Sequence, residues 1–271
     1  MVSLSRNMRR IAALSVAVLC ISAHGNGQSV QPAQDPKVTG LALFQAKEYE
    51  QAIGPLTQAR KENADDMQVL LALGTSLARV GKTEDAQSVF ADLLRRHPNS
   101  PELHLLWGQA YASVARPAEA EEEFREALRL NPKLPEAHYN LGLLLLKRQR
   151  LNEAISEFRA ELEINPEDTV DRYDLAVALL HMNQVSAAMT ELEHVLKADP
   201  QNADANFEYG KAKLNAGDVQ SAIEHLERAV HANPDKAYAH YQLARAYLKA
   251  KRPQDANREF AKVKSLRGIP E

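Results

Sequence analysis

The side chains best suited to chemistry in this 271-residue chain are its nine histidines and its 36 carboxylates. Two histidines three or four residues apart on one helix could hold a metal ion, but no pair in the chain has that spacing. Neither an HExxH nor a CxxC element occurs. We therefore expect no metal site and no cofactor.

Two groups of these residues call for a structural rather than a catalytic interpretation. His104, His138 and His240 are separated by multiples of 34 residues, and we expect them to pack against a neighbouring helix. The acidic run Glu121-Glu122-Glu123 is typical of a solvated helix face. Since the chain also lacks a Gly-rich phosphate loop and a nucleophile elbow, we predict that it is not an enzyme.

The spacing of 34 residues extends over most of the chain, which repeats itself seven times without an insertion or deletion. Counted from the first residue of each copy, place twenty is always alanine, and place eight is always glycine or alanine. Large apolar residues dominate places seven and twenty-four, and a proline closes most copies. The copies are 33–66, 67–100, 101–134, 135–168, 169–202, 203–236 and 237–270.

Each copy contains two runs of apolar residues at helical spacing, separated by a short polar turn, and so predicts two antiparallel helices. The small residues at places eight and twenty fall on different helices, where they would let the two backbones approach closely. Pro101 and Pro135 are expected in the first turn of first helices, and Pro117 and Pro253 at the start of second helices.

This pattern resembles the tetratricopeptide repeat over residues 33–270. The third copy shows the motif most clearly, with Trp107, Gly108, Tyr111, Ala120, Phe124, Ala127 and Pro132. The resemblance implies an all-α fold, a right-handed superhelical solenoid of seven helix-turn-helix repeats. It also implies a concave face, lined mainly by first helices, that binds a protein or peptide partner.

The first 23 residues have the features of a secretory signal peptide. Three arginines precede an apolar run from Ile11 to Ala23, and small residues that offer cleavage sites follow. A membrane anchor is the alternative, but the run is shorter than the roughly 20 residues that span a bilayer, so no stable span is expected. We expect residues 1–23 to be cleaved, 24–32 to form a flexible tether, and the mature protein to be periplasmic or secreted.

Removal of residues 1–23 changes the charge and the redox chemistry of the chain. The mature protein keeps 30 basic and 36 acidic side chains, a net charge of −6, which disfavours non-specific binding of nucleic acid. The only cysteine, Cys20, is also removed, so the mature chain can form no disulfide.

An apolar stripe remains on the first helices, at places five, nine and twelve, turned by about one residue from the stripe that faces the second helix. In copies four to seven it is bulky, and it is flanked by the cations Lys147, Lys211, Arg245 and Lys249. The candidate ligand-binding residues are Tyr139, Leu146, Tyr173, Leu180, Phe207, Lys211, Leu214, Tyr241, Arg245 and Leu248. Packing between repeats is an equally good explanation of the rings.

The sequence thus predicts a non-catalytic protein-protein interaction module of the exported bacterial type, with a peptide or protein segment in its concave groove. Apolar and cationic rows on one face suit a partner that carries an acidic or carboxylate group. The alternative is a structural or assembly subunit of an envelope complex, such as pilus, secretion or cytochrome-maturation machinery. An enzyme, or its regulatory part, would need a catalytic domain that the chain lacks.

Overall fold

The computed structural model describes residues 35–268, which contain fourteen α-helices and no strand. The expected signal peptide and tether lie outside the described residues. The helices are α2 (Pro36–Gln45), α3 (Tyr49–Glu62), α4 (Met67–Arg79), α5 (Thr83–Arg96), α6 (Pro101–Ser113), α7 (Pro117–Leu130), α8 (Ala137–Lys147), α9 (Leu151–Ile164), α10 (Thr169–His181), α11 (Val185–Ala198), α12 (Ala203–Asn215), α13 (Val219–Ala232), α14 (Ala237–Lys249) and α15 (Pro253–Leu266).

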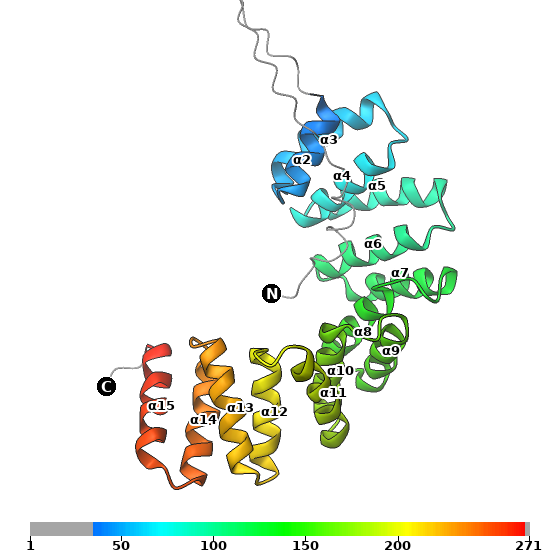
Figure 1. Cartoon of the computed structure of the whole chain (residues 1–271). Helices are drawn as coiled ribbons and strands as arrows, with labels where there is room; N and C mark the ends of the chain where they lie inside the picture. Colours follow the sequence, from blue (N-terminus) through cyan, green and yellow to red (C-terminus); the bar gives the residue numbers. More distant parts are fainter. Residues whose placement is uncertain (1–34, 269–271) are drawn as a thin grey trace, which may run out of the picture. The chain divides into compact units, whose positions relative to one another are not determined.

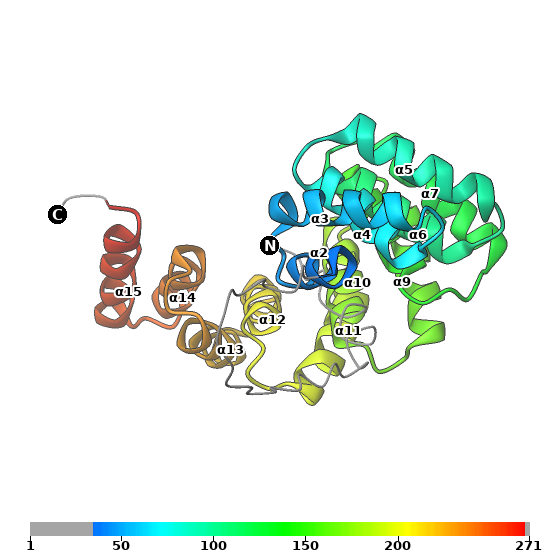
Figure 2. The ribbon, with the colours of Figure 1, turned by 90° about the horizontal axis from the view of Figure 1, so that it is seen from above.

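The helices form seven antiparallel pairs, α2 with α3 through α14 with α15, which we call repeats one to seven. The second helix of each pair packs against the first helix of the next pair, and Figure 1 shows the pairs following one another in chain order. In the view from above, α12 to α15 again stand side by side (Figure 2). The all-α repeat solenoid expected from the sequence is therefore confirmed.

Small residues at places eight and twenty allow the helices of a pair to interlock. A Cβ atom at Gly108 would lie 2.5 Å from the ring of Phe124 and 3.2 Å from the carbonyl oxygen of Ala120. Glycines at the same place in four other repeats meet the place-twenty-four side chain in the same way. The space predicted for close backbone contact is thus filled mainly by a large apolar side chain.

The buried side chains form two clusters rather than one continuous core. The larger runs from Ala52 in repeat one to Tyr209 in repeat six, and the smaller from Leu214 to Ala256. Aromatic contacts join neighbouring repeats within the larger cluster, since the ring of Trp107 stacks on Phe90 of the preceding repeat at 4.4 Å. Packing between repeats therefore supplies much of the core, as expected for a repeat array.

Place fifteen, in the turn between the helices of a pair, has a left-handed backbone in all seven repeats. There the chain ends the first helix with two hydrogen bonds, for example Gln149 N to Leu146 O and Arg150 N to Leu145 O. Glycine fits this conformation without strain, but only two repeats have it. The seven residues are Lys47, Gly81, Ala115, Gln149, Asn183, Gly217 and Lys251.

The first helix of repeat four begins later than expected. Pro101, Pro117 and Pro253 are the first residues of their helices, but α8 begins at Ala137, so the prediction for Pro135 was wrong. Glu136 instead adopts a left-handed backbone with φ of 69°. The buried carboxylate of Glu161 accepts hydrogen bonds from the backbone N–H groups of Glu136 (2.8 Å) and Tyr139 (3.2 Å), and this satisfies the start of the helix.

Candidate functional site

The histidines at place four contact the second helix of their own repeat, as expected, but through hydrogen bonds. Nδ1 lies 2.7 Å from a carboxylate oxygen of Glu123 in His104 and 2.6 Å from one of Glu157 in His138. Within residues 35–268, no group of three or more His, Cys, Asp or Glu side chains could hold a metal ion. Sequence reasoning missed these glutamates, although their recurrence at place twenty-three opposite a polar place four was a visible signal.

The acidic run on α7 is not a solvated face. The carboxylate of Glu121 binds Arg125, Arg148 and Arg150, with N–O distances of 2.6–3.0 Å, and only Glu122 in the run is exposed. Burial opposes ionisation of Glu121, but the hydrogen bonds from the arginines hold its pKa below the usual value. The prediction failed because these places face neighbouring helices of the array, which the sequence of a single helix does not show.

The apolar stripe predicted at places five, nine and twelve of the first helices, which we call the inner stripe, is part of the packing between repeats in repeats four and five. Tyr139, Leu146, Tyr173 and Leu180 are partly buried and lie against the larger core. The hydroxyl of Tyr139 donates to Asp174 Oδ2 at 3.0 Å. Burial raises the pKa of Asp174 to about 6, although that hydrogen bond opposes the shift. Burial is also the main reason that the pKa of Tyr173 is raised.

The inner stripe is also largely covered in repeat six. One of the residues predicted there to bind a ligand is fully buried, so that prediction was wrong. Leu214 is 0% exposed in the smaller core, because α14 packs against α12 and covers it. The ring of Phe207 meets the ring of Tyr238 edge-on, with centroids 4.6 Å apart. The ammonium of Lys211 lies 5.6 Å from the Phe207 ring and 3.1 Å from a carboxylate oxygen of Glu208.

Repeat seven exposes the stripe that the other repeats bury. Tyr238, Tyr241 and Leu248 are 41%, 44% and 49% exposed, and they are three of the six exposed large hydrophobic residues within 35–268. With Arg245 they are spaced three, four and three residues apart, so they share one face of α14. We call these four residues the α14 stripe. Tyr238 was missed from the sequence because it occupies place two, outside the places considered.

Arg245, like Lys249 and unlike Lys211, bonds to a neutral acceptor rather than to a carboxylate. Its guanidinium donates to the neutral amide oxygen of Gln242 at 2.9 Å, and it forms no ion pair with any described residue. Lys211 is paired with Glu208, and Lys249 donates to the carbonyl oxygen of Leu214 at 3.1 Å. The α14 stripe therefore combines exposed apolar side chains with one uncompensated guanidinium.

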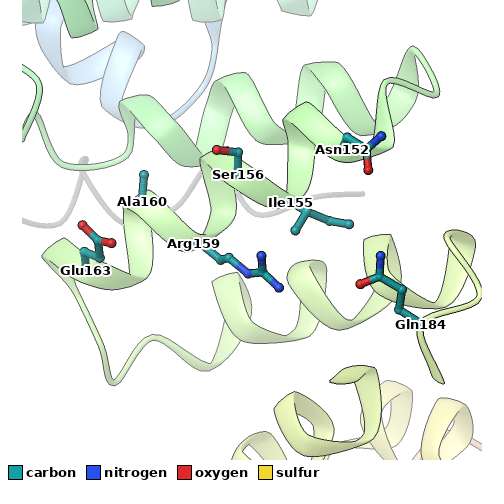
Figure 3. A pocket seen from close by; sticks show the side chains of 7 residues that line it. All are labelled: Asn152, Ile155, Ser156, Arg159, Ala160, Glu163 and Gln184. Atoms are coloured by element: carbon teal, nitrogen blue, oxygen red, sulfur yellow. The ribbon is translucent and has the colours of Figure 1, made fainter. Parts of the chain in front are cut away.

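A shallow groove of about 410 Å³, shown in Figure 3, lies along the second helix α9 and shares no lining residue with this stripe. Six of its lining residues come from α9 and one, Gln184, from the turn that precedes α11. Figure 3 shows the side chain of Arg159 reaching into the space between these two segments. The lining is mostly polar, and consists of Asn152, Ile155, Ser156, Arg159, Ala160, Glu163 and Gln184.

Solved structures with the same architecture include three repeat proteins. MamA from Desulfovibrio magneticus RS-1 is 24% identical, with a TM-score of 0.58 over 63% of this chain and 97% of that one. YrrB, described as a TPR protein with an unusual peptide-binding site, is 19% identical, with a TM-score of 0.58 over 65% and 91%. PilF from Pseudomonas aeruginosa is 19% identical, with a TM-score of 0.63 over 73% and 90%.

Sequence comparisons give the family but no individual relative. No curated protein sequence matches the chain. None of the helices within 35–268 has the length and apolar character needed to cross a bilayer. Two tetratricopeptide-repeat families match, one at residues 71–135 and 105–169 and the other at 145–214 and 213–265. The chain therefore belongs to the tetratricopeptide-repeat proteins, which are generally non-catalytic protein-interaction modules.

Proposed function

We propose that this protein is a non-catalytic module that holds a peptide or protein segment on the side lined by first helices, against the exposed face of α14. The observation that carries the proposal is the α14 stripe, where three large apolar side chains are exposed on one side of a helix beside the partly buried Arg245. Aromatic and arginine side chains are the residues that most often dominate binding energy at protein interfaces.

The chemistry of the α14 stripe also defines the partner. Tyr241 and Leu248 offer apolar area to a hydrophobic side chain of the bound segment. Arg245, which lies between them in sequence, can bind a carboxylate through two parallel hydrogen bonds. The partner is therefore an apolar segment that carries an acidic side chain or a terminal carboxylate.

The proposed place of action is outside the cytoplasm, in the periplasm or the secreted fraction. This part of the proposal rests on three features of the N-terminal sequence: the arginines near its start, the short apolar run that ends at Ala23, and the small residues at the expected cleavage site. Mass spectrometry of the cell-envelope form should find an N-terminus between about residues 24 and 28. An intact Met1 would contradict cleavage.

The binding proposal is tested by selecting peptides from a random dodecapeptide display library on the mature protein. The wild type should enrich peptides that combine apolar residues with Asp, Glu or a free C-terminus. Arg245→Glu should reverse the charge preference toward Lys and Arg, and Tyr241→Ala with Leu248→Ala should abolish enrichment. If the wild type enriches no peptide at all, the α14 stripe is not a peptide-binding surface.

The matched control is Arg159→Glu, a charge reversal of the same size on the groove of the second helices. It should leave the selected peptides unchanged, because Arg159 is exposed on α9 and is not part of the α14 stripe. Thermal unfolding of each variant, followed by helical circular dichroism, separates lost binding from lost folding. Exposed charge reversals usually change stability by less than about 0.5 kcal/mol.

A second candidate function is that of a structural or assembly subunit of an envelope complex, such as pilus, secretion or cytochrome-maturation machinery. The observation that favours it is the polar groove of α9 and Gln184, shown in Figure 3, which shares no lining residue with the α14 stripe. Co-purification from envelope extract at high salt distinguishes the two functions. A stoichiometric complex that survives in Arg245→Glu but is lost in Arg159→Glu would favour the assembly role.

A further inference from the structure

In repeats three to seven, the side chain at place four connects the two helices of its own repeat and the turn that leads into the first helix. In His138, Nδ1 lies 2.6 Å from a Glu157 carboxylate oxygen on α9, while Nε2 lies 3.0 Å from the carbonyl oxygen of Pro132. Pro132 closes repeat three, so the ring connects repeat four to its predecessor. His240 makes the same two contacts, with Glu259 at 2.5 Å and Pro234 O at 2.9 Å.

His104 repeats the arrangement in repeat three, with Glu123 at 2.7 Å and the carbonyl oxygen of Pro98 at 3.5 Å. A carbonyl oxygen and an ionised carboxylate can only accept hydrogen bonds. An imidazole ring can therefore serve both partners only when both of its nitrogens carry a hydrogen, which is the imidazolium form. The neutral ring leaves one of the two acceptors without its donor.

Other repeats fill the same place with groups that do not titrate near neutral pH. In repeat five, the guanidinium of Arg172 donates to Glu191 and to the carbonyl oxygen of Pro166, both at 2.8 Å, and it is always charged. In repeat two, the corresponding residues Leu70 and Val89 are both buried and apolar. The chain thus contains internal controls for the histidines.

Repeat six reverses the arrangement. The amide of Asn206 donates to the carbonyl oxygen of Pro200 at 2.9 Å, and its own oxygen lies 2.8 Å from Nδ1 of His225. Burial, with the nearby Arg228, lowers the pKa of His225. This ring therefore titrates at lower pH than an unperturbed imidazole.

The charges around two of the place-four histidines favour the imidazolium. The bonded Glu123 is the main reason that the pKa of His104 is raised, and Glu126 on the same helix adds to it. The bonded Glu157 raises the pKa of His138, with Glu161 of α9 contributing. Burial acts in the opposite direction at both rings.

We propose that protonation of His104 and His138 locks the joints by which repeats three and four stack on the repeats before them. In the locked form each ring holds the first helix to the second helix of its own repeat and to the turn that joins it to the preceding repeat. Loss of the proton frees one contact at each joint.

The test is hydrogen exchange at pH 6.0 and 8.5, corrected for the intrinsic effect of pH on exchange. In the wild type, amides of α6 and α8 should lose protection about threefold to tenfold at the higher pH, the range for one hydrogen bond. Amides of α10, held by Arg172, should not. The double variant His104→Arg, His138→Arg should lose this pH dependence, because it copies the contacts of repeat five.

The idea is wrong if α6 and α8 respond no more than α10, or if the double variant keeps the response. A second measurement covers a variant that fails to fold: NMR titration of the wild-type rings of His104 and His138. Both should titrate above about 6.5, the value for an unperturbed imidazole. Titration of both rings below that value would also overturn the proposal.

Discussion

Repeats four and five and repeat seven carry the same residue types at the same places on their first helices, but these residues have different roles. Tyr173 and Leu180 are partly buried against the larger core, whereas Tyr241 and Leu248 are 44% and 49% exposed. The difference arises because first helices of consecutive repeats pack together, and no further repeat follows α15 within residues 35–268. A place in the repeat therefore has a structural role where another repeat covers it.

The largest effect is expected for the two leucines at place twelve. Leu214→Ala should lower the free energy of unfolding by about 2–5 kcal/mol, because the fully buried side chain leaves a cavity. Leu248→Ala should change it by less than about 0.5 kcal/mol, because half of that side chain is in water. Chemical denaturation of both variants checks the pair, and equal losses would break the comparison.

Replacing the two tyrosines at place five should also lower the free energy of unfolding more in the covered repeat than in repeat seven, but the difference should be smaller than for the leucines. Tyr173→Ala should cost about 2–3 kcal/mol, below the value for a fully buried ring, because the side chain is only partly buried. Tyr241→Ala should cost less than about 1 kcal/mol. If the α14 stripe binds the peptide, the loss of peptide enrichment should be larger for Tyr241→Ala than for Tyr173→Ala, because only the Tyr241 ring is widely exposed. A stable but non-binding Tyr173→Ala variant would contradict this assignment.

Place six offers a pH-dependent comparison, because it is the partly buried Asp174 in repeat five and Gln242 in repeat seven. The folded-state pKa of Asp174 is raised to about 6 from an ordinary value near 3.8. A raised pKa means that stability is present at low pH and is lost as the pH rises between these two values. Asp174→Asn should remove this loss and raise the unfolding free energy at pH 7.5 by about 1–3 kcal/mol.

The measurement for Asp174 is the midpoint of thermal unfolding at pH values from 4 to 8. The amide keeps an oxygen that can accept from Tyr139, so the variant tests charge rather than shape. A midpoint that falls equally in wild type and variant between pH 4 and 6 would show that another group is responsible. His104 and His138, whose pKa values are raised, act above this range, so the two effects separate.

The smallest effect is expected in the turns, where position in the array should not matter. Gln149→Gly in repeat four and Lys251→Gly in repeat seven should each stabilise by up to about 1 kcal/mol, because both backbones are left-handed. The control Gly81→Ala should destabilise by a similar amount. Equal gains in stability at the two sites would show that repeats four and seven differ only at side chains that a neighbouring repeat covers.

Most of the fold could be predicted from the sequence, but only part of the candidate site. Alanine at place twenty and the small residue at place eight recur because two helices interlock there, and that constraint is visible in one chain. The inner stripe was also visible, but its division into buried and exposed members was not. Leu214 and Leu248 are identical in type and place, and only the presence of a covering helix separates them.

The sequence by itself determined the helices, their pairing and the repeat, because 34-residue spacing and small-residue positions act within one or two neighbouring units. Only the tertiary structure decided which charged side chains have a partner of opposite charge. It placed Glu121 among three arginines and left Arg245 with only the amide of Gln242. Burial and ion pairing depend on which helix lies across from a residue, and that distance in space has no fixed counterpart in sequence spacing.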